Sequence, residues 1–278
     1  MADVVTLFAS VALARRVELS ACSMLRASAA ASDGFFIDVG RGGTAVFRGV
    51  GSPSTKVMGL GFDEALDVSA LERVEQVWDA HGAEVVIELC TLARAGVAET
   101  ICARGYLLAG FEDVLLAPLD ADRRAPELPA STSITHVGAD DLETWVQVSA
   151  DGFLHADNEG VAHHETFSRE ILERALRSSI SQHYLAWRDG EPAAAASMRI
   201  VDGVAWLNGS ATLPAHRRRG LQTALVQHRL ALARDEGADI ATMTTSPGSR
   251  SKHNAERRGF ALAYSRAVLR RPHRASRA

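Results

Sequence analysis

Residues 216–230 read HRRRGLQTALVQHRL, and this stretch decides the fold. Three arginines stand directly before Gly220, and the apolar spacing after it predicts a helix from about Gly220 to Glu236. Upstream, NGSATLP (208–214) reads as the end of a strand that Pro214 stops. A strand, a tight turn and a helix start leave backbone amides unpaired at the positive end of the helix dipole. The pattern predicts a seat for a phosphate group, although a solvated basic turn would look the same.

The positive charge at this turn is local. Arg217, Arg218 and Arg219 surround one glycine, but the whole chain of 278 residues has a formal net charge of −4. No basic stripe and no interleaved aromatic residues extend from the turn, so a nucleic-acid partner is not predicted. Gly220 would let the backbone approach an anion closely, because a side chain there would block it. The sequence therefore favours a small phosphorylated ligand.

The composition is typical of a globular protein without a membrane partner. No stretch is long and apolar enough to span a bilayer. The N-terminal run MADVVTLFASVALARR carries its acidic residue first and its arginines last, the reverse of a secretory signal. Cys22, Cys90 and Cys102 show no metal-ligand spacing, and HHE at 163–165 has no second cluster, so no metal is predicted. We expect Cys90 and Cys102 to be buried free thiols in a reducing, cytoplasmic setting.

Apolar periodicity and turn residues divide the chain into two α/β halves. In the first half we expect helices over 4–30, 69–82 and 95–105, and strands over 35–40, 44–50, 56–62, 83–92 and 110–119. In the second half we expect helices over 140–149, 163–179, 220–236 and 249–259, and strands over 133–138, 237–245 and 261–271 with three more within 181–213. The predicted domains are 1–119 and 133–271, joined by a proline-rich linker (120–132) and followed by a disordered tail (272–278).

The two halves share one internal repeat. Each contains a helix, a Gly-Ala-acid turn, a strand, a second helix, an Arg-Gly-aromatic turn and a last strand. Gly82 and Gly105 are 23 positions apart, and Gly237 and Gly259 are 22 apart. The matched landmarks predict two diverged copies of one α/β unit.

The second copy resembles a known family. RRRGLQTAL, preceded by NGSATLP and followed by GAD, a strand and NAERRGF, resembles the core of the GNAT superfamily of acyl-CoA-dependent N-acyltransferases. Arg217 and Gly220 match the family signature, but Gln222 stands where glycine or alanine is usual, so its side chain must point away or bond to the cofactor. The resemblance covers about 133–271. It implies two tandem α+β domains, each a mixed, mostly antiparallel twisted sheet flanked by helices and splayed at the cofactor site.

The resemblance implies an acetyl-CoA site. The pyrophosphate would lie on the amides of the turn, and the pantetheine arm would add like a strand to the end of the preceding strand. Ser251 and Asn254 on the late helix are candidates to touch the arm, although both residue types also favour helix starts. The implied cofactor-binding residues are Ala211, Thr212, Leu213, Arg217, Arg218, Arg219, Gly220, Leu221, Gln222, Thr223, Ser251 and Asn254.

The first copy lacks the signature. Its corresponding segment, DEALDVSALE, has no arginine–glycine turn, and Asp63, Glu64 and Asp67 would repel a pyrophosphate. We therefore expect a degenerate copy that does not bind CoA.

The residues that carry the chemistry are not evident. Relatives often have a glutamate base and a tyrosine acid at positions that hold Leu207 and Ala255 here. Tyr264 and His253 are the remaining catalytic candidates, against the alternatives of a packed strand tyrosine and a surface histidine. The amide of Leu213 could donate to the thioester carbonyl.

The predicted function is transfer of an acetyl group from acetyl-CoA to an amine in a ternary complex. The segment DGFLHADNEG, with His155, Asp157 and Glu159, favours a small cationic amine, whereas a protein amine stays open as the acceptor. A non-catalytic acyl-CoA sensor also fits the missing acid and base. The sequence does not choose between a monomer and a homodimer.

Overall fold

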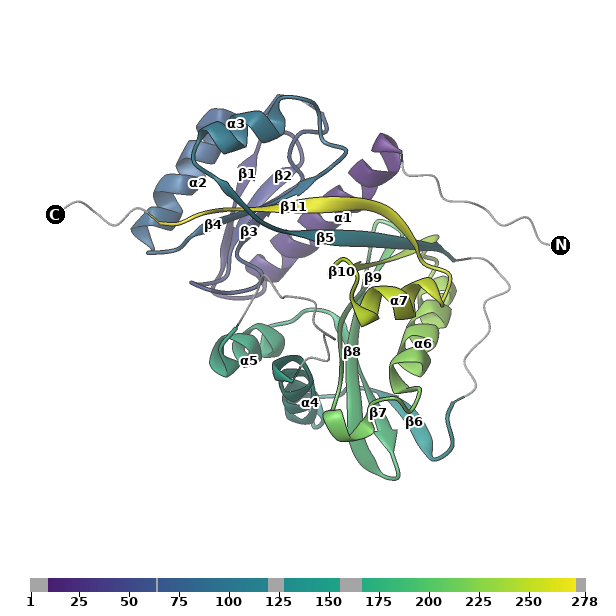
Figure 1. Cartoon of the computed structure of the whole chain (residues 1–278). Helices are drawn as coiled ribbons and strands as arrows, with labels where there is room; N and C mark the ends of the chain where they lie inside the picture. Colours follow the sequence, from purple (N-terminus) through teal and green to yellow (C-terminus); the bar gives the residue numbers. More distant parts are fainter. Residues whose placement is uncertain (1–9, 64, 120–127, 156–166, 274–278) are drawn as a thin grey trace. The chain divides into compact units, whose positions relative to one another are not determined.

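The computed structural model of the chain describes residues 10–63, 65–119, 128–155 and 167–273 (Figure 1). The described residues form two compact units. The N-terminal unit contains 10–63, 65–113, 167 and 263–273, and the C-terminal unit contains 114–119, 128–155 and 168–262.

The N-terminal unit has a mixed sheet with strand order β1-β2-β3-β4-β11-β5. Its elements are α1 (Val11–Ala30), β1 (Phe35–Val39), β2 (Gly43–Phe47), β3 (Lys56–Met58), α2 (Val68–Ala80), β4 (Val85–Cys90), α3 (Val97–Ala103), the first part of β5 (Leu107–Pro118) and most of β11 (Ala261–Arg271). The predicted helices and strands are present, but the helix predicted over 4–30 does not run through Ser10. Ser10 is extended and caps α1 by accepting a hydrogen bond from Leu13 N at 3.1 Å. β3 is shorter than predicted because Gly59 and Gly61 take positive φ angles of 75° and 79°, which end the extended backbone.

The C-terminal unit has the strand order β5-β10-β9-β8-β7-β6. Its elements are the last part of β5, β6 (Thr132–His136), α4 (Leu142–Leu154), α5 (Arg169–Arg177), β7 (Gln182–Arg188), β8 (Glu191–Val201), β9 (Val204–Thr212), α6 (Leu221–Asp235), β10 (Ile240–Thr245) and α7 (Arg250–Glu256). The three strands predicted within 181–213 are confirmed as β7, β8 and β9. Both of its tight turns place two consecutive residues at positive φ, which matches the twist of a hairpin.

The last strand of each half completes the unit of the other half. The end of β5 lies beside β10, where Thr242 Oγ1 donates to the Leu115 carbonyl at 3.1 Å. In the N-terminal unit, β11 lies between β4 and β5 (Figure 1) and pairs antiparallel with β4. Two copies of one β-α-β unit can exchange equivalent strands, because each strand meets similar partners in either place. The predicted domains, 1–119 and 133–271, follow the sequence repeat. The compact units differ from them because the end of β5 belongs to the C-terminal unit and most of β11 belongs to the N-terminal unit.

Each unit has its own core. In the N-terminal unit α2 buries Trp78 against β2 and β4. In the C-terminal unit α4 and α6 cover opposite faces of β8 (Figure 1), which presents the buried run 193–196 of four alanines. These small side chains allow both helices to approach the sheet closely. No helix within the described ranges is long and apolar enough to cross a membrane.

One expectation about the cysteines is wrong. Cys22 and Cys90 are buried free thiols, but Cys102 is exposed. Helix α3 buries Val97 and Ile101, which are four residues apart on one face, and Cys102 lies about 100° further around the helix.

A buried histidine makes the stability of the C-terminal unit depend on pH. His183 on β7 stacks on Trp145 of α4 with ring centroids 3.8 Å apart, and its Nδ1 lies 3.2 Å from Ser197 Oγ. Burial lowers the pKa of His183 from 6.5 to about 4. Between these values the unfolded chain binds a proton that the folded chain does not. The free energy of unfolding is therefore expected to fall by up to about 3 kcal/mol as the pH drops through this window.

The measurement is chemical unfolding at several pH values from 7 to 4. His183→Gln should flatten the pH dependence, whereas the exposed His253→Gln should leave it as in the wild type. An unchanged slope in His183→Gln would show that other groups control the acid response.

Candidate functional site

The strand before the arginine–glycine turn is open along one edge. β9 and β10 pair in parallel from Val204 with Ile240 to Trp206 with Thr242, and the register ends there. Among the residues that the structure describes, β9 continues to Thr212 with β8 as its only strand partner. The edge of β9 that faces away from β8 is therefore left without a strand partner beyond Trp206.

The turn itself leaves a helix start free. Arg218 and Gly220 take positive φ angles of 61° and 81°. Helix α6 begins at Leu221 with Gly220 as an N-cap that has no side-chain hydrogen bond, and the first helical bond runs from Ala224 N to Gly220 O at 2.9 Å. The helix thus does not use the amides of 221–223. Left-handed residues next to free amides form the kind of concave backbone that binds anions.

The three arginines have different roles. Arg217 Nε donates to the Thr212 carbonyl at 3.3 Å, and its Nη2 donates to the His155 carbonyl. These bonds tie the turn to the end of β9 and to the end of α4. Arg218 and Arg219 are exposed beside the free helix start. The arginine that matches the family signature therefore supports the backbone, and the other two supply charge at the surface.

Gln222 is directed toward α7. Asn254 Nδ2 donates to Gln222 Oε1 at 2.7 Å, so the two residues predicted at this site do meet. The signature usually has glycine or alanine at this position, so the Gln222 side chain was expected either to point away from the cofactor or to bond to it. The bond to Asn254 corresponds to the first of these arrangements. Ser251 is exposed and does not cap α7, because Ser249 Oγ accepts the hydrogen bond from Lys252 N at 3.2 Å.

The expected oxyanion donor is engaged elsewhere. The amide of Leu213 donates to the Ala193 carbonyl at 3.0 Å, so it faces β8. Because backbone groups alternate between the two edges of a strand, the amide of Thr212 faces the open edge of β9 instead. The role predicted for the Leu213 amide therefore fits Thr212 better.

The usual acid and base positions hold core residues. Leu207 and Ala255 are both buried in the apolar core of the C-terminal unit. His253 is exposed on α7. Tyr264 lies in the N-terminal unit, where its hydroxyl donates to Glu18 Oε1 at 2.7 Å and burial raises its pKa. Asp157 and Glu159 lie outside the described residues.

The corresponding turn of the N-terminal unit is closed. Asp67 caps α2 by accepting from Ala70 N at 2.9 Å, and Asp63 forms an ion pair with Arg15 at 2.7 Å. The hollow at this turn has a volume of about 10 Å³, which is at most the space that one water molecule needs. A carboxylate therefore already occupies the helix start, in contrast to α6. Glu64 lies outside the described residues.

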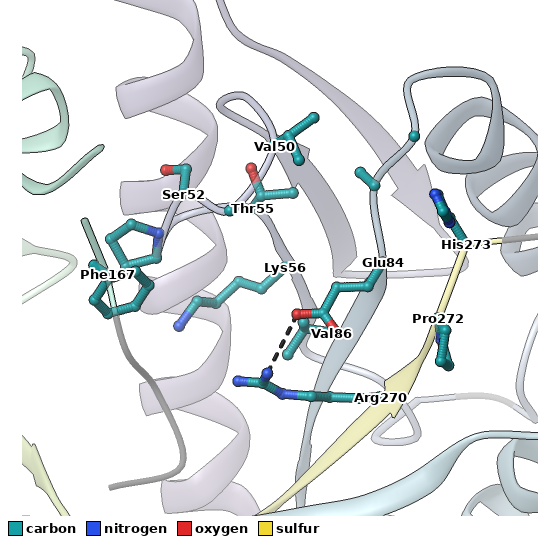
Figure 2. Close-up of a pocket in the computed structure, with 14 residues that line it drawn as sticks. Val50, Ser52, Thr55, Lys56, Glu84, Val86, Phe167, Arg270, Pro272 and His273 are labelled. Carbon is teal, nitrogen blue, oxygen red and sulfur yellow. Dashed lines mark hydrogen bonds and ion pairs between the residues drawn. The ribbon is translucent and has the colours of Figure 1, made fainter. Parts of the chain in front are cut away.

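A larger cavity of about 390 Å³ lies in the N-terminal unit (Figure 2). Arg270 Nη1 pairs with Glu84 Oε1 at 3.3 Å across it (Figure 2). Lys56, which also lines the cavity, pairs with Glu88. Since its cationic side chains have carboxylate partners, the lining does not select a charged ligand, and we assign it no function.

One residue of the C-terminal unit escaped the sequence analysis. Arg229 is fully buried on α6. Its position four residues after Leu225 and eight after Leu221 places it on the apolar face of the helix, which is the signal that could have found it.

Comparison with known proteins agrees with this geometry. Residues 145–260 match the model of the acetyltransferase (GNAT) family. A search of curated proteins found no significant match. The chain is similar to a solved GCN5-related N-acetyltransferase from Kribbella flavida, with 22% identity, 94% of this chain and 96% of that chain covered, and a TM-score of 0.70.

Two further solved structures are similar. A GCN5-related N-acetyltransferase from Sphaerobacter thermophilus has 15% identity, coverage of 75% and 66%, and a TM-score of 0.56. A tandem GNAT protein from the clavulanic acid biosynthesis pathway has 13% identity, coverage of 75% and 70%, and a TM-score of 0.57. The matched residues 145–260 contain β9, the arginine–glycine turn, α6, β10 and α7. Residues 145–260 therefore form a GNAT-family acetyltransferase domain, and the chain as a whole shares its fold with solved GNAT proteins, a tandem GNAT protein among them.

Proposed function

We propose that the C-terminal unit is an N-acetyltransferase that uses acetyl-CoA and acts on the amine of a small molecule. The observation that carries this proposal is the uncapped start of α6, next to two exposed arginines and the open edge of β9. The family fold supports acyl transfer in general, and the turn supplies what a pyrophosphate needs.

The residues present fit this cofactor. The free amides at 221–223 and the side chains of Arg218 and Arg219 would hold the pyrophosphate, and the edge of β9 at 211–212 would hold the pantetheine arm. Asn254 would meet the arm from α7 while it keeps Gln222 in place. The start of α6 has no capping side chain, and a phosphate could accept hydrogen bonds from its free amides.

When bound, acetyl-CoA supplies an activated acetyl group: the amine nitrogen bonds to the carbonyl carbon, the carbon–sulfur bond breaks, and sulfur leaves as a thiolate. The Thr212 amide would donate to the carbonyl oxygen from the open strand edge. With apolar residues at Leu207 and Ala255, the chain would contribute mainly by positioning, and the amine would lose its proton to water. His253 and Tyr264 stay weaker candidates for proton transfer.

A sensor that binds acyl-CoA without turnover is the second candidate. The buried, apolar Leu207 and Ala255 favour it, because neither can act as a base or an acid. A protein amine as acceptor is a further variant of the transferase.

Titration calorimetry with acetyl-CoA, followed by a thiol-release assay with a panel of small amines and a peptide, tests the proposal. We expect one binding site per chain, because the α2 turn is closed, and release of free CoA only when an amine is added. Binding without turnover on any acceptor would favour the sensor. A folded chain that does not bind acetyl-CoA would contradict both candidates, and two sites would show that the N-terminal unit also binds.

A further inference from the structure

Arg229 places a buried cation among neutral oxygens. Its guanidinium donates to the carbonyls of Ser197 at 2.7 Å, Asn208 at 3.2 Å and Leu225 at 3.1 Å, and to Ser210 Oγ at 2.8 Å. Across the described part of the chain, no ion pair is recorded for this arginine. Burial lowers its pKa to about 9, so it stays a cation at neutral pH.

The acceptors of Arg229 define an irregularity in β9. The register between β8 and β9 shifts where Ala195 pairs with Ala211 and Ser197 pairs with Asn208. Gly209 and Ser210 are therefore bulged, and Gly209 takes a positive φ of 62°. A bulge disrupts the ladder and bends the strand. From its place on α6, the guanidinium of Arg229 therefore donates hydrogen bonds to Asn208, directly before the bulge, and to Ser210 within it.

Stability alone does not explain this residue. Burying a cation without a carboxylate partner costs its free energy of hydration. Hydrogen bonds to neutral acceptors compensate for only part of that cost. The apolar neighbours Leu225 and Leu230 on the same helix show that α6 can cover the sheet without charge. The bulge also stands two residues before Thr212, on the stretch of β9 that lacks β10 as a partner.

We propose that Arg229 is a positioning residue for acyl transfer: it fixes the β9 bulge so that the open edge at Thr212 is aimed at the thioester carbonyl, and its charge favours negative charge on that oxygen. This inference rests on the proposed function, since it deepens the role of the same site. Arg229 acts through Asn208, Ser210 and the strand edge, and its own contacts are to the protein.

The test compares Arg229→Met and Arg229→Lys with Leu230→Met, a buried control on the same helix. Methionine can fill much of the site without charge, and lysine keeps the charge with fewer donors. We expect Arg229→Met to fold and to bind acetyl-CoA within about threefold of the wild type, but to lose about a hundredfold in kcat at similar KM. Arg229→Lys should recover part of kcat, and Leu230→Met should behave as the wild type.

A second readout does not require an acceptor. The infrared carbonyl band of bound acetyl-CoA, labelled with ¹³C at the carbonyl, should lie at lower frequency in the wild type than in solution, and should return toward the solution value in Arg229→Met. An unshifted band in the wild type, or wild-type kcat in Arg229→Met, would overturn the inference. A parallel loss of binding, kcat and thermal stability would also overturn it, because that pattern indicates packing alone. Failure of the proposed function itself is distinct, since it appears as absent binding or turnover in the wild type.

Discussion

The double variant Arg218→Glu, Arg219→Glu is expected to bind acetyl-CoA at least a hundredfold more weakly than the wild type. Both side chains are exposed beside the uncapped start of α6. Each charge-assisted hydrogen bond to a phosphate contributes about 1.5–3 kcal/mol, and the new carboxylates add repulsion. Titration calorimetry measures the loss. Thermal unfolding should change little, because neither side chain is part of a core.

The control is the double variant Arg73→Glu, Arg174→Glu. These arginines are also exposed, and the change in net charge is the same. Arg73 stands in the second turn of α2, a helix that the carboxylate of Asp67 already caps. We expect its affinity for acetyl-CoA to equal that of the wild type. Equal losses in both double variants would mean that overall charge controls binding, and would remove the turn as the site.

The double variant at Arg218 and Arg219 tests the electrostatic contribution more directly than a substitution at Gly220 does. The positive φ of 81° at Gly220 strains any residue with a side chain, and a Cβ there would lie 3.3 Å from Pro129 Cγ. Loss of binding in Gly220→Glu would mix backbone strain with electrostatic repulsion.

Glu18→Ala is expected to lower the stability of the N-terminal unit by about 3–5 kcal/mol. Glu18 is fully buried and accepts from Arg266 Nε at 2.8 Å and from the Tyr264 hydroxyl at 2.7 Å. Its removal leaves two buried donors without this acceptor. Arg266 keeps its ion pair with Glu88 at 3.1 Å, which limits the loss. Circular dichroism should show a midpoint of thermal unfolding about 10 °C lower.

Two further variants, Glu84→Ala and Tyr264→Phe, serve as comparisons for Glu18→Ala. Glu84→Ala removes a carboxylate of the more exposed pair with Arg270 and should cost no more than about 1 kcal/mol. Tyr264→Phe should lose part of the stability and keep the acetyl-transfer activity, because its hydroxyl serves the buried pair. A folded Tyr264→Phe variant without activity would instead restore Tyr264 as the acid. Equal midpoints for Glu18→Ala and the wild type would show that the buried pair does not stabilise the unit.

The sequence alone predicted the signature turn, because everything that forms it is local. Within 212–223 a strand ends, a proline follows, and Gly220 supplies the left-handed residue before an amphipathic helix. The cap of α2 is equally local, since the Asp67 carboxylate accepts from the amide of Ala70, three positions later. The elements of both halves follow from periodicity and turn residues for the same reason.

The tertiary structure alone decided which distant residues meet. Glu18 and Tyr264 are 246 positions apart, and nothing local to either one indicates the other. The exchange of β5 and β11 was equally hidden, because the two copies offer similar neighbours to either strand. The orientation of the Leu213 amide depended on the register of β8 against β9, and a one-residue change in such a register reverses every backbone group. Arg229 found its acceptors only through the bulge of a strand about twenty positions away, so its role required the packed fold.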